Sequence, residues 1–406
     1  MTAPHAPLDP AAVTAVIAPV ERARTLPAAA YLDPEVFAWE QRWFFDHGWV
    51  CLGRTADMPA PGDQRAVTVG TSGVLLVRDR AGALGAFANA CRHRGHELLP
   101  CGADTTNRGT ILCPYHGWAY DLDGSLRNTP RFGDHEAFAR AEASLVRLRS
   151  EEHGGWTFVN VSGTAAPLLD SLGNLAEVGA TYPLDDLVVG ASHRYELTAN
   201  WKIAQENYHE CYHCPLIHPE LVRISPADSG DAFDGHRGAW VGGTMELIDE
   251  ADTMSLDGRS GGAVFESVQG TRLEREIVYA GVFPNLLLSL HPDYVMTHRM
   301  EPVAPDRTIV ECQWLFAPEV VARPDFDPSY AVDFWDLTNR QDWAAVESVQ
   351  RGLRTPGWVP GWFAKFEDDV WRFANLVARG YQGRDVTTIG TWDDLDVDRS
   401  ERGASA

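Results

Sequence analysis

The stretch that decides the fold is Cys91-Arg92-His93, followed after nineteen further residues by Cys113-Pro114-Tyr115-His116. Each half pairs a cysteine with a histidine, in a C-x-H and in a C-x-x-H spacing. Two such pairs, presented by two opposed loops, can hold a compact metal centre between two thiolates and two imidazoles. The same residue types also build structural zinc sites, so iron and zinc are both open at this point.

A second group of metal-binding residue types follows in Glu206-Asn207-Tyr208-His209-Glu210-Cys211-Tyr212-His213, with His218 five residues later. Two histidines and a distant carboxylate form the facial triad of a non-haem Fe(II) that activates O2 at its open positions. This downstream motif, and the histidine in second place of both earlier pairs, favour a Rieske [2Fe–2S] cluster over zinc. A chain with a one-electron store and an oxygen-activating metal is predicted to be an oxygenase.

On these motifs the chain resembles the oxygenase (alpha) component of the Rieske non-haem iron ring-hydroxylating and N-demethylating oxygenases, over nearly its whole length. The resemblance implies that the cluster ligands are Cys91, His93, Cys113 and His116. One departure is the gap between the two pairs, which is longer than expected and is predicted to extend the loop over residues 101–109.

The resemblance also implies the ligands of the mononuclear iron, namely His213, His218 and Asp342. Asp342 lies in Asn339-Arg340-Gln341-Asp342-Trp343, which with Glu347 and Gln350-Arg351-Gly352 resembles the family's carboxylate-bearing stretch. From the residues alone, Asp368 and Asp369 are rival carboxylates.

Two roles are open for the Glu210 carboxylate. It either orients His213, as carboxylates behind metal ligands do, or it bridges the mononuclear iron and a cluster histidine of a neighbouring chain, as the family resemblance implies. Subunit rings are typical of the family, so a homotrimer is expected. The Glu210-Cys211-Tyr212-His213-Cys214 segment resembles the branch that acts on choline, carnitine and betaines.

The resemblance therefore predicts monooxygenation of a small quaternary ammonium substrate, by O2, at an N-methyl or adjacent carbon, with demethylation. The alternatives are hydroxylation of an aromatic ring or aromatic acid, and a redox or metal-binding protein without oxygenase turnover. The sequence holds no G-x-G-x-x-G run after a strand and no C-x4-C-x2-C cluster motif. Electrons are thus expected from a separate NAD(P)H reductase, possibly through a ferredoxin.

The composition excludes some classes of binding partner and indicates the cellular compartment. The net charge of −23 argues against binding to nucleic acids or anionic membranes, and no apolar run reaches the roughly 18 residues that span a bilayer. The five cysteines outside the cluster motif are expected to be reduced, which fits a cytoplasmic protein; they are Cys51, Cys101, Cys211, Cys214 and Cys312.

The predicted fold is α+β, with an N-terminal antiparallel β-domain for the Rieske [2Fe–2S] cluster and a C-terminal helix-grip-like domain, an antiparallel sheet with helices, for the mononuclear iron. The predicted divisions are an arm and helix packing on the catalytic domain (1–47), the Rieske domain (48–162), the catalytic domain (163–383) and an acidic tail (384–406).

Periodicity and turn residues place the main elements. Asp33 and Asn200 are predicted helix N-caps, Asp123-Gly124 a hairpin turn, and residues 333–353 a helix that carries Asp342. The helix after Asn200 is predicted to carry Glu206, Glu210 and His213 on one face and to end at Pro215, with His209 turned away from that face, as a surface residue or one behind a ligand. Strands are expected over residues 74–77, 84–88, 155–161, 194–198, 275–283, 286–290, 294–300 and 309–316.

Two features of the catalytic half stay open. Residues 228–270 read either as a lid over the active site or as a plain surface loop. Most of the aromatic residues downstream are expected to be core, while two or three could form a cage for a quaternary ammonium group; the candidates are Trp240, Phe265, Tyr279, Phe283, Tyr294 and Trp314.

Overall fold

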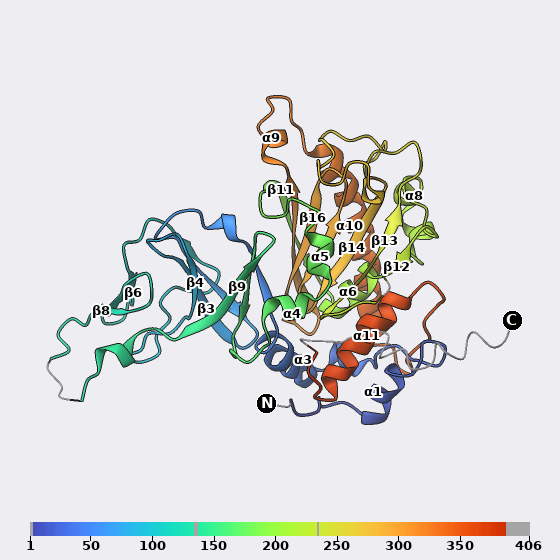
Figure 1. Cartoon of the computed structure of the whole chain (residues 1–406). Helices are drawn as coiled ribbons and strands as arrows, with labels where there is room; N and C mark the ends of the chain where they lie inside the picture. The colour runs from blue at the N-terminus through green and yellow to red at the C-terminus, as the bar shows by residue number, and fades with distance from the viewer. Residues whose placement is uncertain (1–2, 134–136, 234, 387–406) are drawn as a thin grey trace. The chain divides into compact units, whose positions relative to one another are not determined.

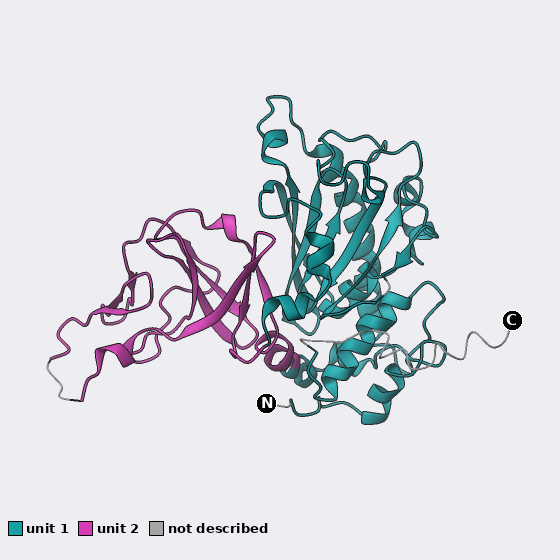
Figure 2. Ribbon diagram, viewed as in Figure 1, with its two compact units in different colours: residues 1–39, 166–406 teal, residues 40–165 magenta. Residues whose placement is uncertain are grey.

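A computed structural model describes residues 3–133, 137–233 and 235–386 of the 406-residue chain (Figure 1). The chain forms two compact units: residues 40–165, and residues 1–39 together with 166–406 (Figure 2). Most of the predicted acidic tail, residues 387–406, lies outside the described residues.

The unit of residues 40–165 is built on a seven-stranded antiparallel sheet in the order β1-β10-β9-β4-β3-β2-β5. Strands predicted over residues 74–77, 84–88 and 155–161 correspond to β3, β4 and β10. The strands are β1 (Val50–Arg54), β2 (Gln64–Val69), β3 (Ser72–Arg78), β4 (Leu84–Ala88), β5 (Asp104–Thr105), β9 (Arg147–His153) and β10 (Trp156–Asn160).

A smaller three-stranded sheet in the same unit carries one of the two loops with a cysteine–histidine pair. It consists of β6 (Ile111–Leu112), β7 (Ala119–Tyr120) and β8 (Leu126–Asn128). The predicted Asp123-Gly124 turn joins β7 to β8, and the loop between β6 and β7 contains Cys113 and His116. Cys91 and Cys113 are both buried in the hydrophobic core of this unit, so the two loops begin from fixed points.

The second unit contains a seven-stranded antiparallel sheet in the order β11-β17-β16-β15-β14-β13-β12. Its four long C-terminal strands lie where the sequence predicts them. The strands are β11 (Val188–Leu197), β12 (Asp231–Ala232), β13 (Trp240–Glu246), β14 (Glu276–Val282), β15 (Leu286–Leu290), β16 (Val295–Ala304) and β17 (Arg307–Phe316).

Three helices of this unit position the site: α6 (Trp201–Tyr208), α10 (Ser329–Gly352) and α11 (Asp368–Tyr381). Helix α6 contacts both α10 and α11 and also contacts β16, while α10 reaches β11 (Figure 1). The remaining helices are short; they are α1 (Pro10–Val16), α2 (Ala29–Leu32), α3 (Pro34–Glu40), α4 (Leu168–Leu172), α5 (Leu175–Gly179), α7 (Cys214–Ile217), α8 (Pro219–Val222) and α9 (Pro318–Val321). A π-helical turn (Gln41–Phe45) follows α3 directly.

The predicted helix starts are confirmed. Helix α3 begins at Pro34, and the Asp33 carboxylate accepts the Glu35 N–H at 2.8 Å. Helix α6 begins at Trp201, where the Asn200 side-chain oxygen accepts the Lys202 N–H at 3.1 Å. Among the described residues, no helix is both long and apolar enough to cross a membrane.

Residues 228–270 are neither a simple lid nor a simple surface loop. Strands β12 and β13 lie within the range; β12 pairs with β13, and β13 pairs with β14 in the main sheet. The following loop is anchored by Met254, Phe265 and Val268, all of which are buried. The Gly and Asp content that suggested a loop therefore marks an edge of the sheet and a packed connection.

Candidate metal centres and active site

Two loops of the same design present the first motif. In each, the cysteine N–H donates to the carbonyl five residues later, from Cys91 to His96 and from Cys113 to Trp118. In each, a glycine four residues after the cysteine donates back to the cysteine carbonyl. Those glycines, Gly95 and Gly117, have φ of 75° and 72°, a conformation that favours glycine. The two cysteine–histidine pairs thus sit on matching, internally closed loops.

The four predicted cluster ligands differ in exposure according to residue type. Cys91 and Cys113 are buried, whereas His93 is half-buried and His116 exposed. The two imidazoles approach each other through Nδ1, with 3.1 Å between these nitrogens, so both can bind one metal ion. Burial raises the pKa of the Cys113 thiol, and the neighbouring Cys91 adds to this effect. A bound cation would reverse that shift by stabilising the thiolates. Two inner sulfurs and two outer nitrogens fit a cluster with mixed ligation.

Aromatic side chains enclose these loops. Trp118 stacks on His93, with 4.9 Å between ring centroids and 10° between planes. The Tyr120 oxygen accepts the Arg92 N–H at 3.0 Å and lies 3.3 Å from Cys91 Sγ. A metal-bound Cys91 sulfur would carry no proton, so the Tyr120 O–H would be the donor of that bond. Burial and then the Cys91 contact raise the pKa of Tyr120, which keeps that proton in place. Tyr120 was missed from sequence because a lone tyrosine after the motif carries no spacing signal.

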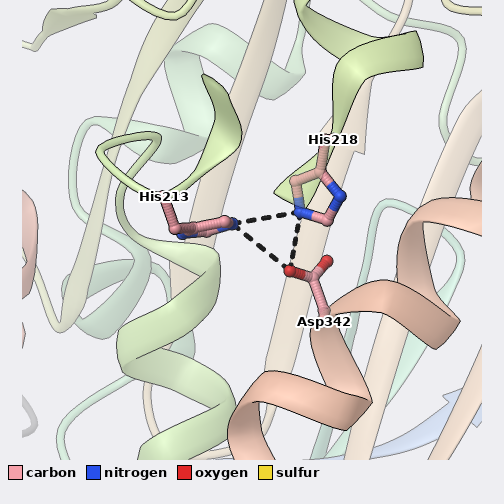
Figure 3. A group of neighbouring side chains, drawn as sticks. All are labelled: His213, His218 and Asp342. Atoms are coloured by element: carbon pink, nitrogen blue, oxygen red, sulfur yellow. Dashed lines mark hydrogen bonds and ion pairs between the residues drawn. The ribbon is translucent and has the colours of Figure 1, made fainter. Parts of the chain in front are cut away.

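The second motif brings together His213, His218 and Asp342 (Figure 3). His213 immediately precedes α7, His218 lies between α7 and α8, and Asp342 projects from α10. His218 Nε2 lies 2.8 Å and His213 Nε2 3.3 Å from Asp342 Oδ1, and 3.1 Å separates the two Nε2 atoms. Two imidazole nitrogens and one carboxylate oxygen at this spacing fit the facial donor set of a non-haem iron.

The outer nitrogen of each imidazole is also held. His213 Nδ1 lies 2.5 Å from Glu210 Oε1, and His218 Nδ1 donates to Gln341 Oε1 at 2.7 Å. Gln341 in turn donates to Glu220 Oε2 at 3.3 Å. Such partners fix the tautomer and the ring orientation of metal-binding histidines. Sequence analysis missed Gln341, although its place beside Asp342 was a usable signal.

The electrostatics of the triad favour a positive charge between its members. Burial alone would lower the pKa of His213, but the Asp342 and Glu210 carboxylates outweigh it and raise that pKa to about 9. Burial opposes ionisation of Asp342, yet the hydrogen bonds from His213 and His218 hold its pKa below the usual range. The rival carboxylates line the same cavity but are not part of the triad: Asp369 is paired with Arg372 at 2.8 Å, and neither Asp368 nor Asp369 belongs to the three-residue group.

The prediction that one helix carries Glu206, Glu210 and His213 is wrong. Helix α6 ends at Tyr208, and the chain then turns. The Glu210 carboxylate accepts the His213 N–H at 3.1 Å, a local bond that competes with helix continuation. Pro215 does not end that helix. It lies in the first turn of α7, where a missing N–H costs nothing.

Two residues near this turn differ from expectation. His209 is not a surface residue; it is buried, and burial lowers its pKa to about 3. Glu206 is not part of the triad, and its carboxylate accepts a hydrogen bond from the Tyr31 hydroxyl at 2.6 Å. Burial raises the pKa of Glu206 to about 7.

The expectation that all five other cysteines are reduced is also wrong. Cys211 and Cys214 form a disulfide, because the turn between α6 and α7 brings their Cα atoms to 4.9 Å. The remaining three form no disulfide, as expected; they are Cys51, Cys101 and Cys312.

A cavity of about 430 Å³ opens beside the triad. Its walls include Tyr208, Tyr279, Trp335 and Trp343, together with His298. Of the six aromatic residues proposed from sequence only Tyr279 lines it, while the other five are buried. Trp335 and Trp343 were missed, although Trp335 precedes Asp342 by two helical turns and shares its face.

Comparison with known proteins matches both halves of the chain. The family model described as "Rieske [2Fe-2S] domain" matches residues 48–139, and that described as "Ring hydroxylating alpha subunit (catalytic domain)" matches residues 184–383.

Among curated relatives, the glycine betaine monooxygenase oxygenase subunit of Chromohalobacter salexigens is 30% identical over 84% of this chain and 82% of its own length. The carnitine monooxygenase oxygenase subunit of Escherichia coli K12 is 30% identical over 83% of this chain and 86% of its own. A solved quaternary ammonium Rieske monooxygenase superposes with a TM-score of 0.76 at 26% identity, covering 92% of this chain and 99% of that one.

Proposed function

Because this chain belongs to the family of Rieske-type ring-hydroxylating oxygenase alpha subunits, we propose that it hydroxylates a small quaternary ammonium compound at an N-methyl group or the adjacent carbon, with demethylation. As a member of this family it carries a Rieske [2Fe–2S] cluster and a mononuclear iron, which when bound supply a one-electron store and O2 activation. Two relatives of comparable length, at 30% identity, are named for glycine betaine and carnitine, which supports this substrate class.

The observation that carries the proposal is a continuous row of aromatic rings in the cavity wall. Trp343, His298, Tyr208, Tyr279 and Trp335 follow one another with 6.0, 6.1, 5.9 and 6.5 Å between successive ring centroids. A quaternary ammonium group has no N–H to donate, so aromatic faces are its main source of specific attraction, at roughly 0.5–2 kcal/mol per ring. Burial lowers the pKa of His298, so this ring is neutral and does not repel a cation.

The charged groups that line the cavity also favour a cationic ligand. Its lining includes Glu210, Asp231, Asp342 and Asp368 as acids. Of its two basic groups, Arg372 is paired with Asp369, and Lys365 is exposed with its ammonium 5.6 Å from the Phe366 ring centre. The balance favours a positively charged ligand over an aromatic acid.

We assign the roles of the site residues accordingly. The mononuclear ligands are His213, His218 and Asp342, with Glu210 and Gln341 fixing the two imidazoles. The cluster ligands are Cys91, His93, Cys113 and His116. The aromatic row holds the substrate's methyl groups beside the triad and excludes water from them.

Electron transfer between chains is part of the proposal, with Glu210 as the bridge in a homotrimer. Beside the cluster loops, Leu112 and Tyr115 are 56% and 54% exposed. Beside His213, Tyr212 and Leu216 are 60% and 91% exposed. Large apolar side chains at both metal sites are typical of surfaces that are covered in an assembly. Electrons are proposed to come from a separate NAD(P)H reductase, directly or through a ferredoxin, in the cytoplasm.

The test is reductase-driven O2 uptake over glycine betaine, carnitine, choline and aromatic acids, with formaldehyde measured in parallel. We expect uptake that depends on a quaternary ammonium compound and yields formaldehyde. Turnover with aromatic acids alone would assign ring hydroxylation instead, and uptake independent of every organic substrate would overturn the proposal. A neutral tert-butyl isostere of the best substrate is the matched ligand control, because it keeps the shape and loses the charge.

A further inference from the structure

The turn that carries His213 is closed by a sulfur pair whose function the oxygenase reaction does not require. Cys211 and Cys214 bracket His213 in a C-x-x-C spacing and are joined by a disulfide. This spacing is the one used by dithiol oxidoreductases, in which the bond forms and breaks reversibly. Both cysteines also line the cavity beside the triad, and Cys211 is the partly exposed member of the pair that a dithiol can attack.

The disulfide connects a residue that is buried in the core, Cys214, to one that is only partly buried, Cys211. Cys214 is buried in the hydrophobic core of its unit, together with Leu221 and Trp335. Cys211 is only partly buried, and Tyr212 after it is 60% exposed. Within the turn, one backbone bond, from Cys214 N–H to the Cys211 carbonyl at 3.2 Å, spans the same two residues. The disulfide therefore ties Cys211, and Glu210 before it, to the core.

A second observation concerns the position of the sulfur. Cys214 Sγ lies 4.0 Å from His213 Nε2, the nitrogen that faces the metal position. Thiolates bind iron strongly, so a free Cys214 is a competing donor at the edge of the triad. In the disulfide, the same sulfur is bonded and no longer competes.

The small size of the loop excludes a general stabilising role as its main effect. The two cysteines are only three positions apart in sequence. The conformational entropy that a crosslink removes from the unfolded chain grows with the length of the loop it closes. A crosslink over so short a loop therefore adds little to the free energy of unfolding. A local effect on the turn is what remains.

We propose that Cys211–Cys214 is a reversible thiol–disulfide site that controls the mononuclear centre: the disulfide holds the turn for iron binding and turnover, and the dithiol releases it. Reduction by a dithiol of the thioredoxin class breaks the Cys211–Cys214 bond and forms the reductant's own disulfide. Two electrons and two protons pass to the two cysteine sulfurs. The inference rests on the proposed role of His213 as an iron ligand.

The test compares the full-length holoprotein before and after treatment with dithiothreitol, removed under argon. Alkylation and mass spectrometry report the state of the 211–214 peptide. Mononuclear iron is followed by its loss to a ferrous chelator, and the integrity of the cluster by its acid-labile sulfide, which does not depend on the oxidation state of the cluster. We expect two newly alkylated cysteines, iron affinity lower by roughly 10–100-fold, unchanged acid-labile sulfide, and recovery when oxidised glutathione re-forms the disulfide and is itself reduced.

Two variants separate this role from a structural one. The double variant Cys211→Ser/Cys214→Ser should respond to dithiothreitol in neither iron retention nor turnover, whatever its starting level. Cys101→Ser, which removes an exposed free thiol, should respond as the wild type does. A peptide that is never oxidised, or equal iron retention in both redox states, would overturn the inference while leaving the function intact. Absent substrate-dependent O2 uptake in the oxidised protein would instead overturn the function.

Discussion

The cluster loops and the mononuclear site each present two imidazoles to one metal position, but the chain assembles them in opposite ways. Each cluster loop closes on itself through two backbone hydrogen bonds, and the two loops lie close in sequence. The mononuclear ligands come from a turn and from a helix 124 residues further on, and side chains hold them. A site whose loops are closed by their own backbone hydrogen bonds can be predicted from a short sequence motif. A site whose ligands are held by side chains from distant segments depends on the packing of the whole unit.

The largest expected effects come from removing one ligand of each site. The intact protein should hold about three irons per chain, two in the cluster and one mononuclear. Asp342→Ala should keep the visible cluster spectrum, lose the mononuclear iron and abolish substrate-dependent O2 uptake. His93→Ala should lose the cluster colour and all activity. Metal analysis and absorbance check both, and zinc with no visible absorbance at the first site would contradict the assignment.

The same two variants test the role of Glu210. Co-assembled His93→Ala and Asp342→Ala chains should regain part of the activity, because an intact cluster then faces an intact iron across one subunit contact. Mixed assemblies are verified by two different affinity tags. If they form and stay inactive, electrons move within one chain and Glu210 is not the bridge between chains.

A smaller effect is expected where a side chain only orients a ligand. Gln341→Leu removes the acceptor for His218 Nδ1 and should weaken mononuclear iron binding by roughly 10–100-fold, with the cluster spectrum unchanged. Chelator competition measures it. The control is Arg340→Gln on the same helix, which breaks only an exposed ion pair with Asp336 and should leave iron affinity as it was. Equal effects of the two variants would assign the loss to α10 as a whole.

Helix α6 leads into the turn that carries His213. The helix carries a partly buried acid, Glu206, and the two cluster loops described above carry none. Because the pKa of Glu206 is about 7 in the folded protein, against 4.5 for the ordinary group, its contribution to stability is present below pH 4.5 and is lost as the pH rises through 7. Glu206→Gln keeps an acceptor for the Tyr31 hydroxyl and should be more stable than wild type by about 2–3 kcal/mol at pH 8. Thermal unfolding midpoints at pH 5 and pH 8 test it; an unchanged difference between wild type and variant would refute it.

The smallest effect is predicted at the cluster. Tyr120→Phe removes one O–H donor to Cys91 Sγ, worth about 1 kcal/mol, or roughly 40 mV for one electron. The reduction potential should fall by that amount, because hydrogen bonds to sulfur favour the reduced cluster. A spectroscopic redox titration measures the shift. A Tyr115→Phe variant, whose exposed ring has no bond to sulfur among the contacts described, is the control.

The sequence was sufficient wherever a short pattern fixes the structure. The cysteine–histidine pairs, the caps at Asp33 and Asn200 and the long strands needed no knowledge of packing. The turn after Tyr208 could not be predicted, because helical spacing cannot reveal that the Glu210 carboxylate binds the His213 N–H. The Cys211–Cys214 bond depends on that turn and was missed with it.

The cavity wall shows the same limit. The candidate aromatics were taken along the chain from Trp240 to Trp314, where Trp240, Tyr294 and Trp314 are simply buried. The rings that line the cavity stand largely on α6 and α10, beside the ligands themselves. Residues one or two helical turns from a predicted ligand are therefore better candidates for substrate contacts than aromatic residues counted along the chain.

The internal closure of the cluster loops has a consequence for protein engineering. Cys91–His96 and Cys113–Trp118 each form a six-residue ring of chain whose two hydrogen bonds lie wholly inside it. The long connection between the two rings supplies no atom to the hydrogen bonds that close them. A change in the length of that connection should therefore leave the closure of each loop intact.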